Sequence, residues 1–205
     1  MKKLAVALFS AGLCLLLTTC CFLPVPEPDY PRQMIEAAVL GDFDAGYAAA
    51  EGWNARNAER ETGEPPIDFG DLFLLAKFIY AQAGNRRYSR EMRLCIGEVV
   101  LNRAASVEFP DSIREVIFEK GQYEFVDSEE FRLYLRPTRD CAEAALALLR
   151  GERMMAPQVV FQSREQIGKV HTAFCDRVMG FTYFCESPNP QLYQTAGVTA
   201  EQLPP

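Results

Sequence analysis

The apolar helical pattern of residues 72–83 contains one amide, Gln82. Gln82 shares a stripe with Leu75, Phe78 and Ile79, because side chains three, four and seven positions apart lie on one helix face. A glutamate at the end of such a buried helix could act as an acid catalyst, but an amide has no titratable proton. We therefore expect Gln82 to face protein and to hydrogen-bond a ligand without acting as an acid.

Glu98 is a carboxylate in a second apolar stretch, residues 89–105, where it lies between Leu94 and Leu101 on one helix face. Burial disfavours the charged form of a carboxyl group, so the pKa of Glu98 should be raised unless the group is paired. A carboxyl group with a raised pKa can serve as a general acid. The sequence leaves a structural ion pair inside the helical bundle as the alternative.

Helices must position both side chains. Asp71 can cap the first helix and the pair Gly84-Asn85 can end it, whereas the second helix begins at Ser89. A short helix is predicted after the turn at Phe109-Pro110, and the run TRDCAEAALALLRG predicts an amphipathic helix. The late runs APQVVFQS and GFTYFCES are β-prone and surround a loop that contains His171. The fold class is thus mainly α (α+β), with a short β element near the C-terminus.

The chain divides into segments of different composition. An alanine-rich stretch, residues 33–57, predicts two short helices broken by Gly41 and Gly46, with Trp53 anchoring them on the domain. We expect a leader over residues 1–21, a linker with N-terminal helices over 22–70, the main domain over 71–187, and a mobile tail over 188–205.

The first residues predict export. Two lysines precede an apolar segment from Leu4 to Leu17, which is too short for a spanning helix and typical of a signal sequence. The residues around Cys20 resemble a bacterial lipobox, although Thr19 stands where a smaller residue is usual. We expect Cys20 to be lipidated, and the domain to lie on the outer side of the cytoplasmic membrane, held there by a lipid. A plain secretory signal or an uncleaved anchor is the alternative.

Composition argues against several classes of partner. The formal net charge is −7, which gives no electrostatic footprint for nucleic acid. The short basic run NRRYSREMR, at residues 85–93, is typical of a solvated face. The chain has one histidine and no CxxC or Cys/His spacing of the kind that binds a metal, so we expect neither a metal site nor a cofactor.

Four cysteines lie outside the leader. Export permits disulfides in this domain. Cys175 and Cys185 form the better pair, because they flank a predicted hairpin. Free buried thiols are the alternative for these two and for Cys95 and Cys141. A thiol hydrolase using Cys175 with His171 is a weaker hypothesis, since no nucleophile motif surrounds them.

Several motifs together resemble the SleB-type cell wall hydrolase family. The chain reads LLAKFIYAQAGN, then VVLNRAASVEFPDSIREVIFEKGQYEF, then a helix ending in LLRG, then VVFQS and GFTYF. The family pattern is "LLA..IYAEA.G", "VVLNRV.S..FP.TI.EVIY..GQF" and a late strand with "HYF". The resemblance covers residues 71–186 and is most specific from VVLNR to GQY.

The resemblance implies a small lysozyme-like helical domain that acts on the glycan strands of peptidoglycan. In such enzymes one glutamic acid serves as general acid and then as base. The family position of that glutamate falls on Gln82. The resemblance also implies a substrate-binding role for five motif residues: Tyr80, Asn85, Gln122, Tyr123 and Tyr183.

Three positions depart from the family pattern: Gln82 replaces the acid, Glu124 replaces a serine, and Thr182 replaces the histidine of "HYF". Two interpretations follow. Catalysis is weakened or lost and the chain is a peptidoglycan- or partner-binding lipoprotein, or the acid has moved to Glu98 or Glu124. A solvated loop charge is the simpler account of Glu124.

Overall fold

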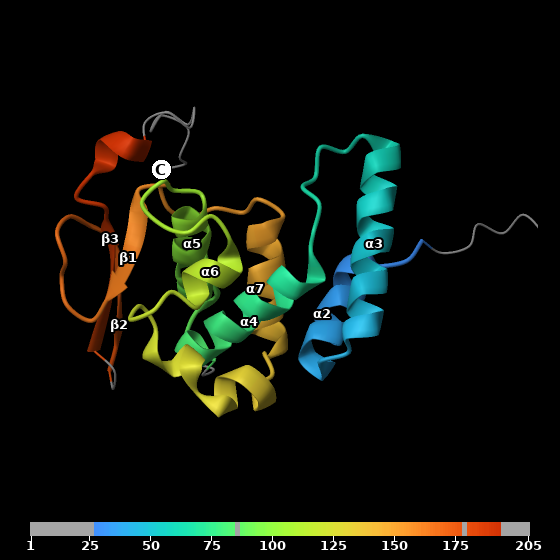
Figure 1. The fold of residues 1–205 in the computed structure, drawn as a ribbon, viewed down its shortest axis with the longest axis horizontal. Coiled ribbons are helices and arrows are strands. Elements are labelled where there is room, and N and C mark those ends of the chain that lie inside the picture. The colour runs from blue at the N-terminus through green and yellow to red at the C-terminus, as the bar shows by residue number, and fades with distance from the viewer. Residues whose placement is uncertain (1–26, 85–86, 178–179, 194–205) are drawn as a thin grey trace, which may run out of the picture.

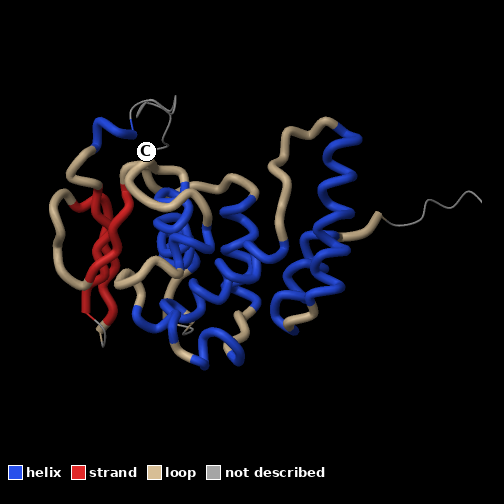
Figure 2. Tube along the Cα trace, viewed as in Figure 1, coloured by secondary structure: helices blue, strands red, loops and turns tan. Residues whose placement is uncertain are grey.

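A computed structural model of the chain describes residues 27–84, 87–177 and 180–193. The predicted leader with Cys20, residue Asn85, and residues 194–205 of the predicted tail lie outside these ranges. Within them the chain is mainly helical with one small antiparallel sheet, which confirms the α+β class (Figures 1 and 2). None of the described helices is both long enough and apolar enough to cross a bilayer.

The described chain opens with a helical hairpin made of α2 (Tyr30–Leu40) and α3 (Phe43–Arg60), seen at the right of Figure 1. Gly41 adopts a left-handed conformation between them, with φ of 71°, and separates the helices as predicted. Gly46 does not break α3 but lies against the Phe69 ring, where no side chain would fit. Trp53 is 4% exposed, as expected of an anchor.

Two buried helices follow, α4 (Phe69–Ala83) and α5 (Arg90–Ala104). Ser89 caps α5, as predicted, by accepting the backbone N–H of Met92. The predicted cap of α4 is wrong: Asp68, not Asp71, is the N-cap, and its carboxylate accepts the N–H of Asp71 at 2.9 Å. The helix therefore begins three residues earlier, and Asp71 lies in its first turn.

Shorter elements complete the helical part: α6 (Ile113–Ile117), the 3₁₀-helix η1 (Glu124–Asp127), the π-helical turn η2 (Glu130–Tyr134) and α7 (Arg139–Leu149). Helices α4, α5 and α7 pack on one another around the core. Gly97 permits this close approach, because a Cβ there would meet the side chains of Ile79 and Leu148.

The sheet lies at the edge of the helical part opposite the hairpin (Figure 1). Its strands are β1 (Val159–Ser163), β2 (Val170–Asp176) and β3 (Gly180–Glu186), in the antiparallel order β1-β3-β2. The prediction missed β2 and assigned His171 to a loop. Its residues alternate between exposed and half-buried, so they offered only a weak apolar signal.

The segment after β3 is held to the domain by Glu108. This carboxylate accepts hydrogen bonds from Ser187 and Asn189, both at 2.7 Å, and from the hydroxyl of Tyr193. Residues Pro190–Tyr193 form the 3₁₀-helix η3. Asn189 and Tyr193 thus contact the domain within the segment where the sequence predicts a mobile tail, from residue 188 onward.

Candidate functional site

Gln82 lies on the last turn of α4 and is half-buried, while its stripe partners Leu75, Phe78 and Ile79 are fully buried. The Gln82 amide therefore lies at the edge of the core, partly covered by protein and partly exposed to water. The Tyr80 ring covers the end of the helix, where it occupies the place that a side chain at residue 84 would need.

A small pocket of about 160 Å³ lies where the chain passes from α4 to α5. It is formed by residues at the start of α5 and by residues of β2 and β3, namely Arg87, Tyr88, Ser89, Met92, Phe174, Cys175, Asp176, Gly180 and Thr182. Thr182 is one of the three positions that depart from the family pattern. The pocket is smaller than an ordinary ligand site and suits only a small group.

Glu98 is fully buried, with 0% exposure. Its Oε2 accepts the backbone N–H of Met154 at 2.7 Å, and its Oε1 accepts that of Met155 at 3.1 Å. Burial raises the pKa of Glu98, and these two hydrogen bonds oppose the rise. The ion pair considered from the sequence is replaced by backbone donors, and the carboxylate ties α5 to the segment after α7.

Gln122 and Tyr123 are brought together by Arg103, which is buried. The Arg103 guanidinium donates to Gln122 Oε1 and to the Tyr123 hydroxyl, both at 3.1 Å, and its Nε donates to the carbonyl of Val160 at 2.7 Å. Burial raises the pKa of Tyr123, and the charge of Arg103 opposes that rise. Glu124 follows in η1 and is exposed. Two of the predicted binding residues thus also hold the loop after α6 to β1.

Tyr183 stacks on Phe181 along β3, with ring centroids 5.6 Å apart and an interplanar angle of 19°. Because side chains alternate along a strand, these two rings lie on the face opposite Thr182. Phe181 is 50% exposed. The pair therefore presents an aromatic surface on one face of the sheet, whereas the small pocket beside Thr182 lies on the other face.

The predicted disulfide is wrong in this structure, where Cys95, Cys141, Cys175 and Cys185 are all free. Cys175 pairs across the sheet with Phe181, whereas Cys185 pairs with Val170, so the two thiols lie at different heights of the sheet. The thiol-hydrolase hypothesis fails as well. His171 and Cys175 are four residues apart on one strand, about 13 Å along it, which is too far for proton transfer.

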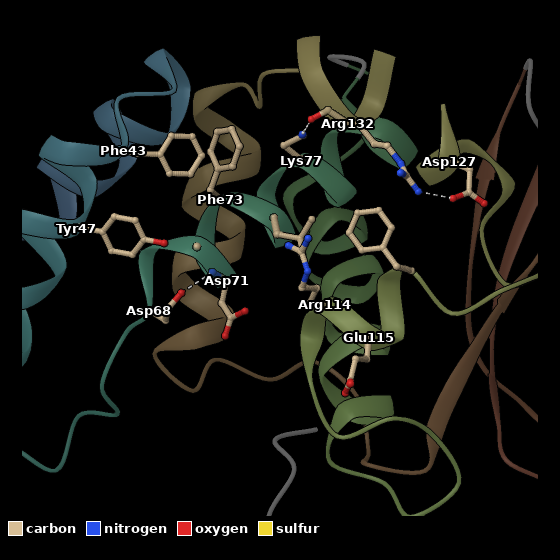
Figure 3. A pocket seen from close by; sticks show the side chains of 13 residues that line it. Phe43, Tyr47, Asp68, Asp71, Phe73, Lys77, Arg114, Glu115, Asp127 and Arg132 are labelled. Carbon is tan, nitrogen blue, oxygen red and sulfur yellow. Dashed lines mark hydrogen bonds and ion pairs between the residues drawn. The ribbon is translucent and has the colours of Figure 1, made fainter. Parts of the chain in front are cut away.

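A much larger groove, of about 1060 Å³, lies at the opposite end of α4 (Figure 3). We call it the hairpin groove, because α3 forms one wall while α4, α6 and the η1–η2 segment form the others. It is lined by Phe43, Tyr47, Asp68, Gly70, Asp71, Phe73, Leu74, Lys77, Arg114, Glu115, Phe118, Asp127 and Arg132. Sequence reasoning missed this site; its signals were Lys77, the one charge inside an apolar helix, and Phe118 in an aromatic-rich segment.

The aromatic side chains that follow α6 lie mostly in the core. Phe131 is buried, Phe125 meets it edge-on at 5.6 Å, and Phe118 meets it edge-on at 6.1 Å. Tyr134 is exposed. No group of three or more histidine, cysteine, aspartate or glutamate side chains within the described ranges is arranged to hold a metal ion.

Comparison with known proteins gives the family. The family model described as Cell Wall Hydrolase matches residues 88–199, more than half of the chain. The match begins after α4, so Gln82 lies outside it. No solved structure gives a significant match. The lysozyme-like architecture therefore stays a prediction.

Three curated relatives are spore cortex-lytic enzymes. The protein of Bacillus subtilis is 35% identical over 99 residues, which cover 47% of this chain and 31% of the relative. The protein of Oceanobacillus iheyensis is 28% identical over 118 residues, which cover 54% of this chain and 41% of the relative. The protein of Halalkalibacterium halodurans is 30% identical over 97 residues. The chain spans less than half the length of these relatives, and by the match to its family model it belongs to the cell wall hydrolase family.

Proposed function

We propose that the chain is an exported member of this family that engages the glycan strands of peptidoglycan, with catalysis weakened or lost because Gln82 occupies the position of the family's acid. Family membership and the likeness to spore cortex-lytic enzymes support the substrate class. An amide of the same size as glutamate keeps the hydrogen-bonding capacity of the position but cannot protonate a glycosidic oxygen.

The observation that carries the loss of catalysis concerns Glu98, the best substitute acid by sequence. Its side chain is 0% exposed, and both of its carboxylate oxygens accept backbone N–H groups. A general acid must come within hydrogen-bond reach of the atom it protonates. Glu98 meets this requirement only if the segment at Met154 and Met155 moves away, so the geometry favours a structural role.

The leader supports a location outside the cytoplasm. A lipid on Cys20 would hold the domain at the outer side of the cytoplasmic membrane, where its substrate lies. The non-catalytic alternative, a lipoprotein that binds peptidoglycan or a partner hydrolase, shares this location. The two differ only in whether glycan is ever cut.

The deciding experiment compares the full-length wild type with the Gln82→Glu variant on purified sacculi, with soluble products identified by mass spectrometry. We expect little release by the wild type, and an increase of about 10²–10⁴-fold in the variant, which is the usual contribution of a general acid. Gln191→Glu, at an exposed residue of η3, is the matched control and should behave as the wild type.

Rapid release by the wild type, with no gain in Gln82→Glu, would contradict the proposal. Glu124 would then be the second candidate, because it is exposed and follows the Gln122-Tyr123 pair. In that case Glu124→Gln should abolish release. If both the wild type and the Gln82→Glu variant bind glycan but release no soluble products, the non-catalytic lipoprotein is favoured.

A further inference from the structure

The hairpin groove is separate from the site discussed above, because its α4 residues lie between Gly70 and Lys77, whereas Gln82 lies on the last turn of the helix. Two of its walls, α3 and α4, precede the part of the chain that the family model matches. On the α3 wall, Phe43 and Tyr47 are 42% and 43% exposed. Large exposed rings beside a groove are typical of a binding surface rather than of a core.

One end of the groove is cationic. Lys77 is 5% exposed, and its Nζ makes one long contact, 3.4 Å, to the carbonyl of Arg132. The ammonium group otherwise lies over the rings of Phe73 and Phe131, at 5.4 and 4.9 Å from their centroids. An ammonium has three donors, so this buried charge is only partly satisfied.

Arg114 adds to this cationic end. Its guanidinium lies 5.4 Å from the centroid of the Phe118 ring, and no ion pair joins it to a carboxylate within the described residues. Arg132, by contrast, is paired with Asp127 at 2.8 Å (Figure 3). Lys77 and Arg114 therefore leave donors available for an anionic group of a ligand, and a guanidinium binds a carboxylate through two parallel hydrogen bonds.

The other end of the groove is anionic. Asp68 and Asp71 lie at the start of α4 beside Tyr47, as Figure 3 shows. Burial, followed by the charge of Asp68, raises the pKa of Asp71. Two close carboxylates without an ion-pair partner among the described residues favour the binding of a cation. An ammonium group placed there would relieve their repulsion.

The separation of the two ends sets the size of the ligand. Asp71 and Lys77 are six residues apart in the helix, which corresponds to about 9 Å along the axis. An extended chain spans this distance in two to three residues. Charges of both signs in one groove also disfavour a polyanion or a polycation.

We propose that the hairpin groove binds a short zwitterionic peptide, with a carboxylate on Lys77 and Arg114 and an ammonium on Asp68 and Asp71. Under the proposed function, on which this identification of the source rests, that peptide is the stem peptide of peptidoglycan, which carries free carboxylates and can carry a free amine. The chain then contacts both components of the wall: the glycan near Gln82 and the stem peptide in the hairpin groove.

The test separates these two components. An amidase splits purified sacculi into soluble stem peptides and stem-free glycan, and binding of each to the full-length chain is measured by calorimetry or co-sedimentation. We expect the free peptides to bind, and Arg114→Ala and Asp71→Asn each to weaken that binding by about tenfold or more. Acetylating the amine or amidating the carboxylates should do the same. Lys120→Ala, which removes an exposed charge outside the groove, is the matched control and should leave binding unchanged.

The results distinguish failure of this inference from failure of the proposed function. Glycan binding without peptide binding overturns the groove assignment and leaves the proposed function standing. Equal peptide affinity in wild type, Arg114→Ala and Asp71→Asn also overturns it. Peptide binding that depends on both residues, without any binding of stem-free glycan, supports the groove assignment and contradicts engagement of the glycan.

Discussion

Two regions of the molecule differ in how their polar groups are satisfied. In α5, the buried side chains of Glu98 and Arg103 are hydrogen-bonded to backbone or side-chain partners, and the pocket at the start of that helix measures about 160 Å³. In the hairpin groove, which measures about 1060 Å³, Lys77, Arg114 and Asp71 have few partners. The first arrangement stabilises the fold, whereas the second leaves hydrogen-bonding capacity for a ligand.

The largest expected effect of a substitution concerns buried Arg103. Arg103→Leu should lower the free energy of unfolding by about 3 kcal/mol, because Val160, Gln122 and Tyr123 lose a charged donor. Arg114→Leu should change it by only about 0.5 kcal/mol. Urea unfolding of both variants tests the contrast, and equal losses would remove the distinction between the two regions.

Glu98→Gln should come next in size. The amide places an NH₂ group against the backbone N–H groups of Met154 or Met155, so a buried donor loses its acceptor at a cost of about 1–3 kcal/mol. Glu143→Gln, at an exposed position of α7, serves as the matched control and should be nearly neutral. A Glu98→Gln variant as stable as the wild type would show that the carboxylate is not needed for the fold.

Asp71→Asn should have a smaller effect of the opposite sign. The pKa of Asp71 is raised in the folded state, so ionising this carboxyl group lowers the free energy of unfolding. This loss of stability develops as the pH rises from the ordinary value of 3.8 through the raised pKa. The variant should therefore be slightly more stable than the wild type at neutral pH. Thermal melts from pH 3 to 7 check this, and the difference should vanish at low pH. A variant less stable than the wild type at pH 7 would contradict the inference that the ionised Asp71 carboxylate destabilises the fold.

Alkylation should have the smallest effect on the fold. Without denaturant, Cys175 should react, because it is exposed, whereas Cys95, Cys141 and Cys185 should react only after unfolding. Burial raises the pKa of Cys95 to about 12, which further suppresses its reaction. Mass spectrometry of peptides locates the adducts. A Cys175 adduct should leave peptide binding in the hairpin groove unchanged, since it lies at the other end of α4.

Much of the fold was predictable because its signals are local. Ser89 caps α5 as expected, the alanine-rich segment forms two helices, and Trp53 is buried. The predicted N-cap of α4 was wrong because Asp68 and Asp71 are equally good caps by residue type. Strand β2 was missed because its alternation is between exposed and half-buried residues, and only pairing with β3 defines it.

The candidate site was less predictable. The sequence identified Gln82 and Glu98 as polar residues in buried helices, and Glu98 is indeed buried. Its partners, the backbone N–H groups of Met154 and Met155, lie more than fifty residues away and carry no side-chain signal. The hairpin groove was missed for a related reason: its lining comes from α3, α4, α6 and the η1–η2 segment, which are distant in sequence.

The sequence by itself determined the family, the helical class and the amide at residue 82, because these depend on motif order, periodicity and residue identity. Only the tertiary structure decided which charges are satisfied. Glu98 and Lys77 are both charges flanked on each side by apolar helical residues, and their local patterns are alike. One meets two backbone donors and the other lines a groove, because packing between distant segments sets the partners available to a buried charge.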